Sequence, residues 1–271
     1  MTHILRSTLW LLFFGSILLA WVWLYQMTAM MGIDLIGRSA GPMVMDGMSM
    51  GKEPMQSDQM GQGMAMSMTE FGPLFAMWAI MMAAMMLPTM IPTLRAYEDL
   101  MHSADGTRTG WGGVIFGYFI AWVVFAAFIT GVQIGLHRTG VVDMLGVAQS
   151  TVISAALLVV VGLFQFSRTK EICHGVCHRP MTYFLGNWKT GGAGGLRMGL
   201  GLGAFCVGCC WGFMALGFVG GVMNLLWMGL ATLFMVIEKL PDIGHRVTKP
   251  MGVLLIVGGV LLGFSPLVTG G

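Results

Sequence analysis

The stretch GLGLGAFCVGCCWGFMALG, residues 199–217, decides the fold of this chain because it is apolar and free of charge over a length that suits a membrane-spanning helix. Its small residues Gly203, Gly208, Gly212 and Gly217 would let a neighbouring helix approach closely. The rest of the 271-residue chain has a similar character, with 56% hydrophobic and 10% charged residues and a mean hydropathy of +0.79. Soluble domains carry about a quarter charged residues, so the sequence predicts an integral membrane protein.

A transmembrane helix needs about 20 largely apolar residues. Seven segments meet or nearly meet this requirement: 8–26, 71–94, 111–136, 150–167, 196–219, 222–238 and 251–268. The predicted fold is therefore all-α, a polytopic bundle of about seven transmembrane helices. The first segment lacks an A-x-A cleavage site, which favours an uncleaved anchor over a signal peptide.

The distribution of Lys and Arg predicts the orientation of the bundle. If the N-terminus is cytoplasmic, all Lys and Arg residues except Arg38, Lys52 and Arg138 fall on the inner side, as the positive-inside rule requires. The C-terminus is then extracytoplasmic, and the expected location is the bilayer of the bacterial inner membrane. The expected parts are an anchor helix (1–31), an extracytoplasmic Met-rich loop (32–70) and a six-helix core (71–271) with a cytoplasmic Cys/His loop (168–197).

Three thiols share one face of the quoted helix. At 100° per residue, Cys206, Cys209 and Cys210 fall within about a third of the circumference, and Met214 points in nearly the same direction. Sulfur donors favour Cu(I), and thiolates also suit zinc. The alternative is that these cysteines only fill a core as small hydrophobic residues.

A second candidate metal site is RTKEICHGVCHRP, residues 168–180. If this segment is helical, i, i+4 spacing brings together Cys173, His174, Cys177 and His178 as a Cys2His2 set, for which zinc is the expected metal. The alternative is a polar turn at the lipid interface with unremarkable thiols.

The second predicted helix is rich in methionine. Its candidate thioether ligands form two adjacent stripes and comprise Met81, Met82, Met85 and Met86. Pro88 follows and would free backbone carbonyls, which a membrane protein tolerates where other groups supply partners. Plain packing by methionine is the alternative explanation.

The predicted extracytoplasmic loop places methionine at about every third position. Its paired thioethers are Met43, Met45, Met48, Met50, Met64, Met66 and Met68. Thioethers bind Cu(I) without deprotonation, so we interpret the loop as a Cu(I) collector, by analogy with copper importers and periplasmic copper-resistance proteins.

The predicted sixth helix ends at Glu238 and Lys239. Ionisable groups in a membrane segment are functional candidates by default, although both could instead extend to the interface. The sequence has no Ser/His/Asp, P-loop or dinucleotide signature and no basic patch with interleaved aromatics. It therefore favours a protein that is not an enzyme and has no nucleic acid partner.

The motifs MWAIMMAAMMLPTMIP, CHGVCHRP, CVGCCW and GGVMN, in this order, resemble a bacterial family of unknown function catalogued as predicted metal-binding integral membrane proteins. The resemblance runs from Phe71 to about Lys249. It implies a role for Met82, Met85, Met86, Pro88, Cys173, Cys177, Pro180, Cys206, Cys209, Cys210, Trp211, Met223, Asn224, Glu238 and Lys239. Related sequences often carry a histidine at the position of Leu202, so a site in this helix would hold sulfur donors alone.

Together these features predict a membrane protein that handles Cu(I), binding it and transporting or delivering it through Met and Cys ligands. Its expected partners are the metal ion and either a membrane metalloenzyme or a periplasmic copper chaperone. Two alternatives stay open. One is an accessory subunit of a membrane metalloenzyme or respiratory complex, and the other is a thiol oxidoreductase that uses Cys206 and Cys209.

Overall fold

The computed structural model describes residues 2–37, 70–101, 103–143, 145–240 and 244–269. Within these ranges the chain forms helices and no β-strand, which confirms the predicted all-α class. The helices are α1 (Thr2–Met30), α3 (Phe71–Met86), α4 (Ile91–Met101), α5 (Arg108–Arg138), α6 (Thr151–Phe164), α7 (Arg168–His178), α8 (Pro180–Asn187), α9 (Gly191–Ala215), α10 (Gly217–Gly220), α11 (Leu225–Glu238) and α12 (Gly244–Thr269).

Five helical stretches of the described chain are long and apolar enough to cross a membrane, which is compatible with a multi-pass membrane protein. They are Ile4–Met30, Phe71–Met101, Arg108–Arg138, Gly191–Gly220 and Arg246–Phe264. Helices α6 and α7 qualify as a sixth only when taken together, and they are bent by 63° at the break between them. Helix α11 is shorter, so the predicted count of seven spans is not confirmed.

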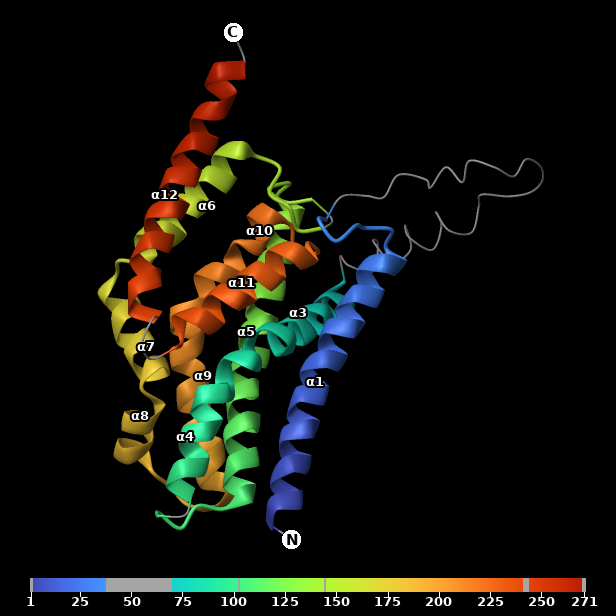
Figure 1. Ribbon diagram of the computed structural model, residues 1–271. Helices are drawn as coiled ribbons and strands as arrows, with labels where there is room; N and C mark the ends of the chain where they lie inside the picture. The colour runs from blue at the N-terminus through green and yellow to red at the C-terminus, as the bar shows by residue number, and fades with distance from the viewer. Residues whose placement is uncertain (1, 38–69, 102, 144, 241–243, 270–271) are drawn as a thin grey trace, which may run out of the picture.

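Helix α5 packs along α9 in the centre of the bundle, and glycines allow the close approach (Figure 1). A Cβ added to Gly195 would collide with the carbonyl of Gly110, and one added to Gly199 would collide with the carbonyl of Val114. Backbones in contact gain dispersion energy that larger side chains would prevent.

The predicted close approaches along α9 are mostly confirmed. A Cβ at Gly203 would lie 2.6 Å from that of Ala121 in α5, and one at Gly212 would lie 2.9 Å from Val161 in α6. A Cβ at Gly208 would lie 2.9 Å from the sulfur of Cys173 in α7. Gly217 differs: it begins α10, and a Cβ there would have its nearest neighbour, Val222, 3.7 Å away.

Pro88 interrupts the methionine-rich helix as predicted, and a short 3-10 turn (Pro88–Met90) separates α3 from α4. The hydroxyl of Thr89 donates to the carbonyl of Met86 at 2.7 Å, which supplies one partner for the backbone at the break. This turn also places the Thr89 side chain inside the bundle.

Two predicted loops have different outcomes. The segment 168–197 is largely helical rather than a loop, because Ser167 caps α7, Pro180 begins α8 and Gly191 begins α9. Of the predicted Met-rich loop, residues 38–69 lie outside the described chain, together with the candidate ligands from Met43 to Met68. Helix α1 begins at the lower end of the bundle in Figure 1 and α12 ends at the upper end.

Candidate metal centre

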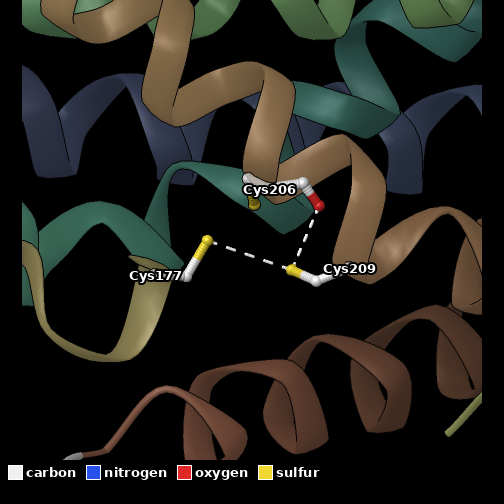
Figure 2. Close-up of side chains that lie close together, drawn as sticks. All are labelled: Cys177, Cys206 and Cys209. Atoms are coloured by element: carbon white, nitrogen blue, oxygen red, sulfur yellow. Dashed lines mark hydrogen bonds between the residues drawn. The ribbon is translucent and has the colours of Figure 1, made fainter. Parts of the chain in front are cut away.

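Three buried sulfur atoms from two helices form a cluster that could hold a metal ion (Figure 2). Cys177 comes from α7, and Cys206 and Cys209 come from α9. Their sulfur atoms all lie within 4.8 Å of one another, and the residues are 6%, 0% and 1% exposed. The sulfurs of Cys177 and Cys209 are 3.9 Å apart. A metal–thiolate bond of about 2.3 Å puts the sulfurs of a trigonal site about 4 Å apart, so the cluster has the size of a three-thiolate metal site.

Helix α9 supplies two of the donors through local geometry. Cys206 and Cys209 are three residues apart and therefore on the same face, and the Cys209 thiol donates to the carbonyl of Cys206 at 3.2 Å. The sulfur of Cys210 lies 3.2 Å from that of Cys209 and is also buried. Cys210 therefore borders the cluster but is not one of its three members.

Helix α7 supplies the third donor because two contacts hold it against α9. Gly208 leaves room for the Cys173 side chain. The ammonium of Lys170 donates to the carbonyl of Cys209 at 2.9 Å. These contacts turn Cys177 towards the two cysteines of α9 (Figure 2).

A buried ion pair lies next to the cluster. Lys170 and Glu238 are 2.9 Å apart, and both side chains are 1% exposed. Thr248 of α12 donates to the Glu238 carboxylate at 2.9 Å. His174 Nε2 donates to the backbone carbonyl of Glu238 at 2.8 Å. The pair therefore ties α7, α11 and α12 together.

A second lysine contacts the cluster directly. Lys239 donates to the sulfur of Cys206 at 3.0 Å and to the hydroxyl of Thr89 at 2.8 Å. The hydroxyl of Tyr118 also lies 3.0 Å from the Cys206 sulfur. Lys239 is 5% exposed and Glu238 is 1% exposed, so both charges are held inside the bundle, which favours a functional role over extension to the interface.

Sequence reasoning missed Lys170, Tyr118 and Thr89 as neighbours of the cluster. Lys170 lies in a polar stretch that gave no sign of burial, and a single tyrosine in an apolar helix has no pattern of its own. Thr89 follows Pro88 directly, and a hydroxyl beside a helix break was the one available signal.

The four residues proposed for zinc lie in helix α7, which meets the condition set for that site, but they face different partners. Cys177 joins the sulfur cluster, Cys173 lies against Gly208, and His174 bonds the backbone of Glu238. The rings of His174 and His178 stack with centroids 5.3 Å apart. In the described part of the chain, their four donor atoms do not form one group.

The predicted thioether ligands are buried in the bundle. Met214 lies in α9, and α3 buries Met81, Met82, Met85 and Met86. The C-terminal end of α3 reaches the metal centre through Thr89, because this residue bonds both the Met86 carbonyl and Lys239.

Comparison with known proteins agrees with a copper-related role. The chain matches the PpoB2 family, described as copper chaperone, over residues 75–262, a range that contains the whole sulfur cluster. No curated protein and no solved structure matches the chain. Because the match extends over most of its length, the chain belongs to the PpoB2 family of copper chaperones.

Proposed function

We propose that this protein is a membrane-integrated chaperone that holds Cu(I) as its cargo between Cys177, Cys206 and Cys209. The observation that carries the proposal is the cluster of three buried sulfur atoms from α7 and α9. Soft thiolates select Cu(I), and copper is the metal of the family.

The charges around the cluster support cargo of this kind. Three thiolates and one Cu(I) carry a net charge of −2, and burying an uncompensated charge is costly. The ammonium of Lys239 lies 3.0 Å from the Cys206 sulfur and offsets part of this charge. Lys170 adds little to the offset, because its charge is matched by Glu238.

Several features support a place in the bilayer of the bacterial inner membrane. Long apolar helices expose large hydrophobic side chains, among them Leu11, Val124 and Leu261. In this setting the extracytoplasmic methionines would collect Cu(I). The buried methionines of α3 and Met214 would serve as transient ligands on the way to the cysteines.

The family description favours delivery over transport to the opposite side. The recipient would be a membrane metalloenzyme or a periplasmic copper chaperone that accepts Cu(I) by ligand exchange. An accessory subunit that delivers metal to its own complex is a special case of this function.

The decisive experiment measures copper and zinc in the detergent-purified protein, produced under reducing conditions with both metals available. We expect bound copper in the wild-type protein and its loss in the variants Cys177→Ser, Cys206→Ser and Cys209→Ser. Cys173→Ser is the matched control, because Cys173 shares α7 with Cys177 but lies outside the cluster.

Two results would contradict the proposal. One is a wild-type protein that holds no copper, and the other is a Cys173→Ser variant that loses as much copper as Cys177→Ser. Zinc bound by the wild type and lost from Cys173→Ser and Cys177→Ser alike would instead support the separate Cys/His site.

The thiol oxidoreductase alternative has weaker support. Thiol–disulfide exchange requires a partner to reach the attacking sulfur, and Cys206 and Cys209 are at most 1% exposed. Quinone turnover that changes in Cys206→Ser while copper content stays the same would favour it.

A further inference from the structure

A pocket of about 670 Å³ lies where the N-terminal ends of α7 and α12 meet, beside the metal centre. Lys170 forms part of its wall and also donates to the carbonyl of Cys209. The pocket is therefore adjacent to the sulfur cluster but is lined by none of its cysteines. Its volume is within the range of small-molecule sites.

Gln165, in the bend between α6 and α7, lines this pocket and is 4% exposed. Neither its amide nitrogen nor its amide oxygen has a hydrogen-bond partner within the described chain. A buried amide without partners is unfavourable, so the side chain is a ready donor for a ligand in the pocket.

The charge of the pocket favours an anion. Arg246 and Lys249 project from the first turns of α12, and among the described residues neither has an ion-pair partner. Lys170 is already paired with Glu238, and Glu171 is the one acidic residue in the lining. Two cations therefore face one carboxylate. The N-terminal ends of α7 and α12 add partial positive charge.

We propose that this pocket binds the phosphate group of an anionic ligand, with Arg246 and Lys249 pairing with its charge and the Gln165 amide donating a hydrogen bond. A helix N-terminus together with basic side chains is a common phosphate site. The phosphate comes from a membrane lipid headgroup or from a soluble phosphate. The lipid source rests on the proposed membrane integration, whereas the site itself is independent of copper binding.

The test uses the full chain, purified and freed of lipid in a neutral detergent. Equilibrium dialysis with inorganic phosphate tests the soluble source. Native mass spectrometry of protein titrated with phosphatidylglycerol, with phosphatidylcholine as reference, tests the lipid source. We expect one of these ligands to bind. The double variant Arg246→Gln/Lys249→Gln should bind it at least about tenfold more weakly, and Gln165→Leu should bind it several-fold more weakly.

The matched control is Arg168→Gln, which removes an exposed cation of α7 that does not line the pocket. The control should bind like the wild type, and all variants should retain their copper content and their melting temperature. Three results would each overturn the proposal: neither ligand binds, the double variant binds as tightly as the wild type, or Arg168→Gln weakens binding as much as the double variant. A wild-type protein that binds phosphate but holds no copper would contradict the proposed function without contradicting the phosphate site.

Discussion

The two cysteine-bearing helices contribute to the metal centre in different ways. Helix α9 is long and apolar, and its own periodicity places Cys206 and Cys209 together inside the bundle. Helix α7 is short and polar, and it contributes only Cys177, while Cys173 remains half-buried. Close glycine contacts hold α9 against α5, whereas α7 is held in place by specific polar contacts. The metal centre therefore depends on how α7 docks.

The largest expected effect comes from breaking the ion pair that docks α7. In Glu238→Gln, Lys170 keeps its charge in a site that is 1% exposed and loses its partner. We expect a loss of about 3–5 kcal/mol in the free energy of unfolding, together with loss of copper as Cys177 moves away from α9. Denaturant unfolding in detergent measures the first effect and metal analysis the second.

The double variant Lys170→Met/Glu238→Leu is the control for this prediction. Replacing both charges by apolar groups of similar size is often neutral, so it should be much more stable than Glu238→Gln. Equal stability of Glu238→Gln and the wild type would show that the pair does not hold α7.

The next largest effect tests the packing of α9. A Cβ at Gly199 would collide with the Val114 backbone of α5. We therefore expect Gly199→Ala to destabilise the protein by about 1–3 kcal/mol, as overpacking does. Gly229→Ala in α11 is the matched control because a Cβ there meets nothing within 4 Å. Melting temperatures that fall equally in both variants would contradict the close α5–α9 contact.

A smaller effect concerns the charge next to the cluster. We expect Lys239→Met to weaken Cu(I) binding about tenfold, because hydrogen bonds to charged groups contribute about 1.5 kcal/mol or more and Lys239 donates to Cys206. Competition with a Cu(I) chelator measures the affinity. Lys189→Met, at an exposed position, should leave it unchanged, and an equal loss in this control would argue against a specific role for Lys239.

The smallest effect of any single substitution on stability separates packing from ligation in α3. Leucine substitutions of the four buried methionines conserve volume, and each such substitution costs less than about 1.5 kcal/mol. The combined variant of Met81, Met82, Met85 and Met86 should keep its copper stoichiometry but load Cu(I) more slowly in stopped-flow measurements. Loading at the wild-type rate would leave these methionines with a packing role only.

The sequence by itself determined the all-α class, most of the apolar helices and the shared face of Cys206 and Cys209. Hydropathy identifies apolar segments as whole helices, and the 3.6-residue period fixes side-chain directions within one helix. The break at Pro88 followed from the same local rules, since proline lacks the amide proton that the helix requires.

Only the tertiary structure decided which cysteines meet. The spacing in α7 predicted that Cys177 would join Cys173, His174 and His178, but Cys177 faces Cys206 and Cys209 instead. Helical spacing fixes the direction of a side chain about the axis of its own helix. The neighbour that the side chain meets depends on how separate helices pack. The same reason explains why Lys170 and Tyr118, distant from one another in sequence, lie next to the cluster without a signal in either of their segments. Lys239 was a candidate from its place in an apolar segment, but its contact with Cys206 depends on the same packing.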